Sequence, residues 1–257
     1  MSAGEAFSRS ELLLGPEALA KLGSASVAVV GIGGVGSFAA EALARSGVGR
    51  LVIVDYDRIE PSNLNRQILA LRSTIGRLKV EVMRERILDI NPGCVVQAFA
   101  ERFDSSSADR ILAPPLDYVV DAIDMVSSKI ELVLRCRGLR IPILSSMGAG
   151  NKLDPGRLEL ADLFSTSTCP LARVMRKELR ARGVESLKVV YSREEPKRRA
   201  AGSGAAAAEA SVPETSGPAA PGPAAPGRRG TPGSMVFVPA AAGLLMASAV
   251  VRDILGR

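Results

Sequence analysis

The stretch SVAVVGIGGVG, residues 26–36, decides the fold of this chain. Residues 26–31 form a short apolar run closed by a glycine, which is typical of a buried strand. A helix is predicted over about residues 34–46, so the spacing G-x-G-x-x-G stands between a strand and a helix. Glycines there let the backbone approach a phosphate closely, and the helix start offers free N–H groups. These glycines are Gly31, Gly33, Gly34 and Gly36.

Strands and helices continue to alternate on the carboxyl side of this motif. Strands are predicted at residues 50–54, 94–99, 117–121 and 141–145, and helices at residues 78–89 and 127–138. This order implies parallel strands joined by helices. The predicted fold class is therefore α/β: a Rossmann-like, doubly wound and mostly parallel sheet with a smaller C-terminal mixed α/β extension.

Composition divides the chain into four segments. Residues 1–150 are the predicted nucleotide-binding domain, and residues 151–199 a basic extension on the substrate side. In residues 200–234, 24 of 35 are Ala, Gly or Pro. Because such a segment buries little apolar surface, it is predicted to be a disordered insertion. Residues 235–257 are predicted to form a strand and a helix that pack back on the core.

The C-terminal segment contains an uncharged, mostly apolar run from Met235 to Val251. A membrane-spanning helix needs about 20 such residues, and this run contains Pro239, which fits a first helical turn. We therefore favour a buried helix over a membrane anchor. The charged first 26 residues do not resemble a signal peptide, and three scattered cysteines fit a reducing compartment. A cytoplasmic protein without stable membrane insertion is expected.

Charge and composition restrict the chemistry. The chain has no histidine, which excludes His-based triads, His metal ligands and His general bases. Its net charge is +6, and residues 170–199, with ten Lys or Arg and four Asp or Glu, account for the same excess. Such a patch suits a polyanion such as tRNA, although a solvated helix face has the same composition.

The glycine motif alone suits NAD, FAD or ATP, and Asp55, which ends the second strand, can hydrogen-bond a ribose. Residues 55–67, DYDRIEPSNLNRQ, distinguish among these. With the preceding glycines they resemble the ThiF/MoeB family, the bacterial relatives of ubiquitin-activating enzymes. The resemblance implies an enzyme that uses ATP to adenylate a carboxylate. Tight NAD binding without ATP binding would instead indicate a dehydrogenase, and a non-catalytic nucleotide-binding scaffold also remains open.

The residue types around the motif suit adenylation. The reaction needs cations and fixed N–H donors around the α-phosphate and the departing pyrophosphate. Arg66 and Lys79 can supply positive charge, and Asn63 and Asn65 can hydrogen-bond phosphate or ribose. Asp124 follows a strand at the carboxyl edge of the sheet, where one carboxylate can hold Mg²⁺.

The resemblance also implies a set of site residues. Arg66, Lys79, Asp124 and Arg9 are implied as catalytic, with Arg9 reaching the ATP of a partner subunit in a homodimer. The implied ATP-binding positions are the four glycines together with Asp55, Asp57, Ser62, Asn63, Leu64, Asn65, Arg66, Lys79, Asp124 and Met125.

Within the family, the chain resembles the tRNA threonylcarbamoyladenosine dehydratase (TcdA/CsdL) branch most closely. It lacks the CxxC pairs of members that activate sulfur-carrier proteins. The similar stretches include FSR at 7–9, INP at 90–92, DAID at 121–124 and PLA at 170–172. This resemblance implies adenylation of the threonyl carboxylate of the modified adenosine in tRNA, followed by dehydrative cyclisation. Activation of a small ubiquitin-like sulfur-carrier protein is the alternative.

The resemblance leaves open whether a sulfur-transfer protein of the cysteine desulfurase type is a partner and whether a monovalent cation is a further cofactor. Cys169 is the one cysteine considered for a covalent role, because it lies beside the basic helix. A small packing residue is the favoured interpretation of Cys169.

Overall fold

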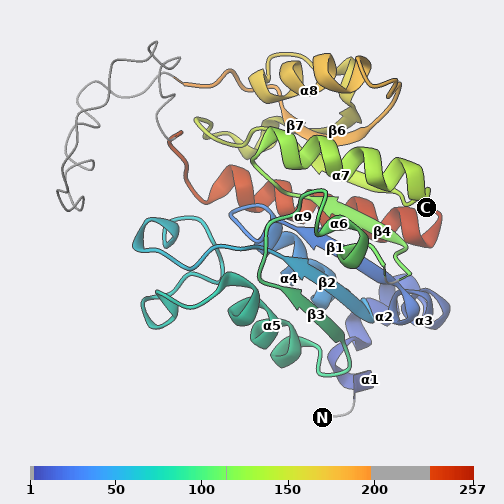
Figure 1. Ribbon diagram of the computed structural model, residues 1–257. Helices are drawn as coiled ribbons and strands as arrows, with labels where there is room; N and C mark the ends of the chain where they lie inside the picture. The colour runs from blue at the N-terminus through green and yellow to red at the C-terminus, as the bar shows by residue number, and fades with distance from the viewer. Residues whose placement is uncertain (1–2, 114, 198–231) are drawn as a thin grey trace.

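A seven-stranded sheet forms the centre of the computed structural model, which describes residues 3–113, 115–197 and 232–257 (Figure 1). The spatial order of the strands is β3-β2-β1-β4-β5-β7-β6. Neighbouring strands are parallel, except that β6 pairs antiparallel with β7 at one edge. The strands are β1 (Ser26–Val30), β2 (Arg50–Val54), β3 (Val95–Phe99), β4 (Tyr118–Asp121), β5 (Ile143–Ser146), β6 (Leu158–Asp162) and β7 (Lys188–Ser192).

The direction of winding changes between β1 and β4. Strands β2 and β3 lie on one side of β1, whereas β4 and β5 lie on the other. In such a sheet, ligands bind in the crevice beyond the carboxyl ends of the strands at this change. Those ends are level here, because Val30 lies beside both Val54 and Asp121 in the register.

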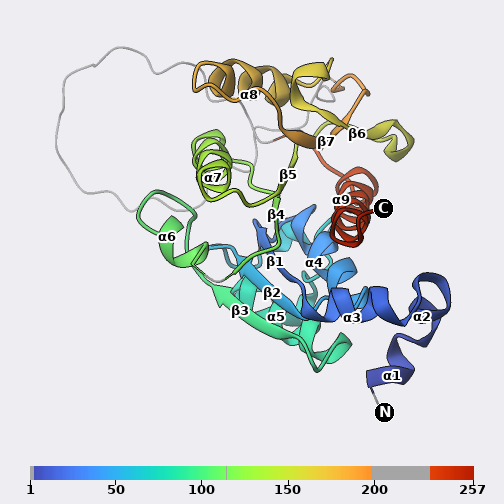
Figure 2. The ribbon, with the colours of Figure 1, turned by 90° about the vertical axis from the view of Figure 1, so that its right-hand side faces the viewer.

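Helices cover both faces of the sheet (Figure 2). Helices α3, α4, α5 and α9 pack on one face, α6 and α7 pack on the other, and α8 packs with α7 near β7. The helices are α1 (Ala3–Ala6), α2 (Ser8–Leu14), α3 (Pro16–Ser24), α4 (Gly36–Arg45), α5 (Lys79–Ile90), α6 (Ala108–Ile111), α7 (Val126–Leu139), α8 (Pro170–Arg180) and α9 (Phe237–Leu255). Short 3₁₀ turns are η1 (Pro61–Asn63), η2 (Arg72–Thr74), η3 (Pro155–Arg157) and η4 (Leu163–Ser165).

The apolar sequence of β1 follows from this two-sided coverage. Val27 and Val29 belong to the core under α4 and α9, and Ala28 and Val30 to the core under α6 and α7. All five residues of β1 are buried. A parallel strand buried on both faces has a continuous apolar run, as residues 26–30 do. The predicted α/β, doubly wound and mostly parallel fold is confirmed.

Helix α9 crosses α4 at very short range. A Cβ atom at Gly243 would lie 2.3 Å from the carbonyl oxygen of Val35 and 3.0 Å from the amide nitrogen of Ala39. Only glycine permits this approach, and it lets Met246 and Val250 of α9 enter the main core. Because Val35 and Ala39 lie at the start of α4, α9 also supports the end of the glycine loop.

Helix α9 is also the one helix, among the residues that the structure describes, that is long and apolar enough by length and composition to cross a membrane. Its buried side packs on α4. The strand predicted within residues 235–257 is wrong. Val236 already has helical angles, φ −62° and ψ −34°, and the chain continues directly into α9. Pro239 takes a place in the first turn, where its missing N–H costs no hydrogen bond.

Two further segments were not predicted to form helices or strands. The predicted disordered insertion at residues 200–234 lies outside the described residues, apart from residues 232–234. At the other end, helices α1, α2 and α3 were not predicted, although Pro16 stands in the first turn of α3, where proline is favoured.

Candidate nucleotide-binding cleft

A cleft of about 590 Å³ opens at the carboxyl edge of the sheet, at the change of winding. Its floor is formed by the ends of β1, β2 and β4 and by the turns that follow them. Of the predicted site residues, ten line this cleft: Gly31, Gly33, Gly34, Asp55, Asp57, Asn63, Arg66, Lys79, Asp124 and Met125. The structure thus brings together residues that are up to 94 positions apart, from Gly31 to Met125.

The glycines of the loop do not all have the same task. A Cβ at Gly36 would lie 1.8 Å from the carbonyl oxygen of Gly31, and one at Gly31, where φ is +91°, would lie 2.7 Å from that of Ala122. Gly31 and Gly36 are therefore required by packing, and Gly36 does not line the cleft. A Cβ at Gly33 would meet nothing within 4 Å. Gly33 leaves the backbone open to the cleft at the start of α4, where an anion is favoured.

Asp55 fixes the glycine loop to the end of β2. Its Oδ2 accepts a hydrogen bond from the N–H of Ile32 at 2.7 Å, and its Oδ1 accepts one from the N–H of Asp57 at 2.9 Å. Burial raises the pKa of Asp55, while the nearby ammonium of Lys79 and the two N–H donors oppose this increase. Both carboxylate oxygens are thus used to hold backbone, a role that the sequence pattern did not predict.

Lys79 lies under the cleft at the start of α5 and is 5% exposed. Its Nζ donates to Asp57 Oδ2 at 2.6 Å and lies 3.8 Å from Asp55 Oδ1. An ammonium group has three donors, so Lys79 can retain these carboxylates and offer a further N–H to a ligand. The two carboxylates place its charge beside the glycine loop.

Arg66 is held at the cleft by its own loop. Its Nη1 donates to the carbonyl oxygen of Ser62 at 2.8 Å and to Asn65 Oδ1 at 3.0 Å. Asn65 in turn donates to the carbonyl oxygen of Ser234 at 2.9 Å, and Asn63 accepts from the N–H of Glu60. Ser62, Leu64 and Asn65 do not line the cleft. Ser62 and Asn65 instead orient Arg66, which leaves its other N–H groups to face the cleft.

Asp124 lies in the turn between β4 and α7. Its side chain is exposed to the cleft and has no hydrogen-bond or ion-pair partner among residues 3–113, 115–197 and 232–257. Met125 follows it as the N-cap residue of α7. No cluster of three or more potential metal ligands occurs in the described part of the chain. A single open carboxylate fits Mg²⁺ that is shared with ligand phosphates and water, and does not fit an all-protein metal cage.

Arg9 is separate from the other predicted site residues. It lies on α2, whose preceding residue Phe7 packs beside Gly47, near the amino end of β2. Figure 1 shows α2 at the end of the sheet opposite the loop of residues 56–78. Arg9 therefore cannot contribute to the cleft of its own chain in this structure.

Part of the cleft wall was not predicted from the sequence. Residues 101–103 line it directly after β3, and the guanidinium carbon of Arg102 lies 5.0 Å from the ring centre of Tyr56. Because the carboxyl ends of parallel strands share one edge, the position of β3 could have indicated them. Gln67 also lines the cleft: it is 6% exposed, and its buried Oε1 has no hydrogen-bond partner among the described residues. A ligand or water can satisfy this amide.

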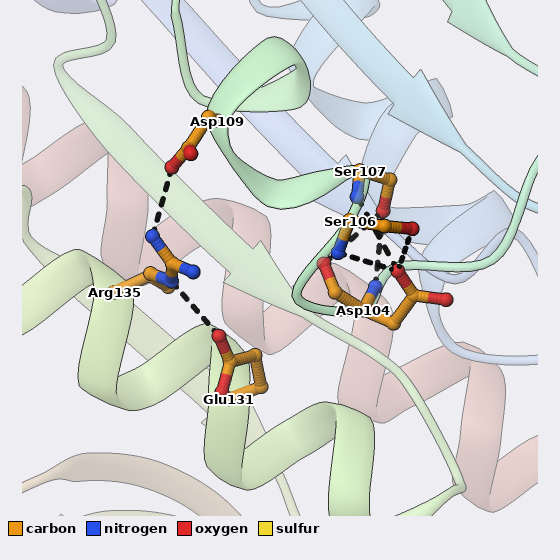
Figure 3. Close-up of polar contacts among 6 residues, drawn as sticks. All are labelled: Asp104, Ser106, Ser107, Asp109, Glu131 and Arg135. Atoms are coloured by element: carbon orange, nitrogen blue, oxygen red, sulfur yellow. Dashed lines mark hydrogen bonds and ion pairs between the residues drawn. The ribbon is translucent and has the colours of Figure 1, made fainter.

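The loop that carries residues 101–103 is anchored just outside the cleft (Figure 3). Asp104 Oδ1 accepts hydrogen bonds from the hydroxyl and the N–H of Ser106, and these contacts lower the pKa of Asp104. Arg135 of α7 donates to Asp109 of α6 and to Glu131, each at 2.8 Å. These contacts connect the cleft wall to α7.

The remaining wall lies on the side of α8. Residues 146–150, Leu171, Pro232 and Ser234 line it, and Cys169 packs beside Gly148. At this rim, Asn151 holds the backbone at Gly233 and at Lys197. Its Oδ1 accepts from the N–H of Gly233 and its carbonyl oxygen from the N–H of Lys197, both at 2.7 Å. Sequence periodicity carried no signal for this contact.

Only some of the Lys and Arg side chains in residues 170–199 are available to bind a polyanion. Arg176, Arg182, Lys188 and Arg193 are engaged by carbonyl oxygens or carboxylates. On α8, three exposed cations have no ion-pair partner among the described residues, and their spacing of four and three places them on one face: Arg173, Lys177 and Arg180. Leu171 at the start of α8 lines the cleft, so this helix begins at the cleft rim.

Comparisons with known proteins find similar sequences along most of this chain. The model of the ThiF family matches residues 7–257. The chain is 44% identical over 256 residues to the tRNA threonylcarbamoyladenosine dehydratase of Bacillus subtilis, covering 97% of this chain and 94% of that protein. It is 42% identical over 175 residues to the Escherichia coli enzyme of the same name, covering 68% and 65% of the two chains.

A solved structure is similar along nearly the whole chain. The crystal structure of the E. coli dehydratase TcdA in complex with ATP matches with a TM-score of 0.82 and 31% identity. The match covers 98% of this chain and 95% of that one. The fold of this chain is thus similar to that of a protein crystallised with ATP.

Proposed function

Because this chain belongs to the ThiF family, we propose that it is an ATP-dependent tRNA threonylcarbamoyladenosine dehydratase. The observation that carries this proposal is one cleft in which the glycine loop, Arg66, Lys79 and Asp124 meet, with the start of α8 at its rim. Such a cleft can bind a nucleoside triphosphate at one side and a nucleic acid at the other.

The proposed reaction has two steps. The threonyl carboxylate of the modified adenosine attacks the α-phosphorus of ATP, and the bond to the departing pyrophosphate breaks. A nucleophile within the modification then attacks the carbonyl carbon of the acyl-adenylate, and AMP leaves with one carboxylate oxygen. The sum of the two steps is the loss of one water from the modification, with ATP converted to AMP and pyrophosphate.

The chain's own residues have defined tasks in these steps. Gly33 and the start of α4 receive a phosphate, and Arg66 and Lys79 balance the charge that develops on the pyrophosphate. Asp57 and Asp55 keep the Lys79 ammonium beside the loop. Mg²⁺, held by Asp124 when bound, would neutralise phosphate charge. No step requires an enzyme thioester, so Cys169, 2% exposed, serves as a packing residue.

We propose that the tRNA backbone lies along Arg173, Lys177 and Arg180. The three side chains form a row on the exposed face of α8, and Leu171 connects the start of this helix to the cleft. Recognition of phosphates by Lys and Arg is the general source of affinity for nucleic acids.

Further parts of the proposal concern assembly and setting. A homodimer would explain Arg9, which cannot reach the cleft of its own chain but can complete that of a partner. A sulfur-transfer protein partner and a monovalent cation remain proposals that rest on the resemblance to the dehydratase branch. We also propose a cytoplasmic location, because the bacterial relatives are named for a reaction on tRNA.

The direct test is conversion of the modified tRNA. Purified protein is incubated with ATP, Mg²⁺ and tRNA that carries threonylcarbamoyladenosine, and the nucleosides are analysed by mass spectrometry. We expect loss of one water from the modified nucleoside with matching formation of AMP, and strongly reduced conversion by Arg66→Ala. Intact modified nucleoside after incubation with folded, ATP-binding protein would refute this function.

A further inference from the structure

A completely buried ion pair lies beneath the turn that carries Asp124. Lys129 of α7 and Asp121 of β4 are both 0% exposed, and Lys129 Nζ lies 2.9 Å from Asp121 Oδ2. Neither residue lines the cleft. The pair also does not belong to the predicted site. Its contacts with the neighbouring backbone indicate its role.

The pair holds both backbone groups of one residue, Ile123. Lys129 Nζ donates to the carbonyl oxygen of Ile123 at 3.0 Å, and Asp121 Oδ1 accepts from the N–H of Ile123 at 3.1 Å. The hydroxyl of Ser145 on β5 also donates to Asp121. Ile123 directly precedes Asp124, so the position of the Asp124 backbone is determined from below by these three side chains.

The same turn supports the glycine loop. The N–H of Ala122 donates to the carbonyl oxygen of Val30 at 2.8 Å. A Cβ at Gly31 would lie 2.7 Å from the carbonyl oxygen of Ala122. A displacement of residues 122–124 would therefore change both the Asp124 carboxylate and the loop across the cleft from it.

A buried ion pair is poorly explained by stability alone. Removing two charges from water is costly, and apolar residues of similar volume often stabilise a core equally well. Here the two charges fix one backbone conformation that apolar side chains could not hold, because they offer no hydrogen bonds.

We propose that Lys129 is a positioning residue, which acts through Ile123 to hold the Asp124 carboxylate where a divalent cation and the nucleotide phosphates meet. The inference deepens the proposed function, since it assumes that Asp124 binds the metal of a metal–nucleotide complex. Residues that orient metal ligands through hydrogen bonds typically change metal affinity or activity by about 10- to 100-fold when they are replaced.

The test compares variants with a readout other than turnover. Mn²⁺ replaces Mg²⁺, and its binding to the protein with a non-hydrolysable ATP analogue is titrated by electron paramagnetic resonance. We expect Lys129→Met to weaken Mn²⁺ binding about tenfold. The double variant Lys129→Met with Asp121→Leu leaves no unpaired buried charge, which limits the loss of folding stability. It also removes the hydrogen bond to the N–H of Ile123, so it should weaken Mn²⁺ binding at least as much.

Arg86→Met is the matched control. It breaks the ion pair between Arg86 of α5 and the 6% exposed Glu41 of α4, which keeps its second partner Arg45, without touching the turn of residues 121–125. The control should lower the midpoint of thermal unfolding but leave Mn²⁺ affinity unchanged. Ser145→Ala, which removes one donor to Asp121, should weaken Mn²⁺ binding less than Lys129→Met does.

Two results would overturn the inference. One is unchanged Mn²⁺ affinity in a folded Lys129 variant, single or double; the other is an equal loss of affinity in Arg86→Met. These outcomes are independent of the proposed function. If the native protein binds Mn²⁺ with nucleotide but never dehydrates tRNA, the function fails, while the comparison of Lys129→Met with Arg86→Met still decides the inference.

Discussion

The salt dependence of tRNA binding is the sharpest consequence of the cationic face of α8. Three residues form this face without ion-pair partners in the described part of the chain: Arg173, Lys177 and Arg180. The perturbation is the triple replacement of these residues by Ala, which keeps helix propensity high. Because the buried face of α8 is formed by Ala172, Met175 and Leu179, the fold should tolerate the change, which also removes the stacking of Arg180 on Phe164 at 5.2 Å.

The expected magnitude follows from counterion release. Each neutralised phosphate contributes about 0.7 to 0.9 to the slope of log affinity against log salt. Removing three contacts should therefore reduce the slope by about 2 to 3. Since the native complex weakens more steeply with salt, the native and variant affinities should converge as salt rises.

Fluorescence anisotropy with labelled tRNA at several salt concentrations measures both slopes. Lys188→Ala is the control, because Lys188 is engaged by Asp253 at 2.7 Å and lies outside α8. The control should keep the native slope within about 0.5, well below the change expected for three contacts. Equal slopes for the native protein and the triple variant would refute the assignment of tRNA to this face.

Three further predictions concern stability and the glycine loop. Gly33→Ala should keep the midpoint of thermal unfolding but weaken ATP binding, because its Cβ would enter the cleft. Gly36→Ala should instead lower the unfolding midpoint, because its Cβ would clash with Gly31. Calorimetry measures both the unfolding midpoints and ATP binding. Lys129→Met should cost about 3 to 5 kcal/mol in urea unfolding, because it leaves Asp121 buried without its cation. Folding lowers the pKa of the Asp104 carboxyl group, so its ionised form stabilises the folded protein at pH values above its unfolded pKa of about 3.9. This stabilisation is lost as the pH falls through the pKa of Asp104 in the folded protein. Ser106→Ala should therefore lower unfolding stability near pH 6 more than near pH 3, and an equal loss at both would contradict the link.

Much of the fold was predictable because its signals are local. The run of residues 26–31 and the spacing of its glycines sufficed for the first βαβ unit, and the family membership implied by residues 55–67 was confirmed. The strand predicted within residues 235–257 failed because Val236 and Phe237 have strand propensity, whereas packing on α4 and Pro239 favour a helix.

The candidate site was predictable to a smaller extent. The predicted residues that meet in the cleft follow strands β1, β2 and β4, whose parallel ends share one edge of the sheet. The use of Asp55 to hold Ile32, and of Ser62 to orient Arg66, depends on loop geometry that has no periodic signal. The ion pair of Lys129 and Asp121 was missed because only the assembled sheet and α7 reveal that both are buried.

The central claim is that the cleft activates a carboxylate on tRNA by adenylation. Exchange of labelled pyrophosphate into ATP measures that step directly, with modified tRNA and a carrier protein ending in Gly-Gly tested side by side. The account predicts exchange that depends on modified tRNA and is strongly reduced in Asp124→Ala. Exchange stimulated only by the carrier protein, or none with either substrate, would contradict it.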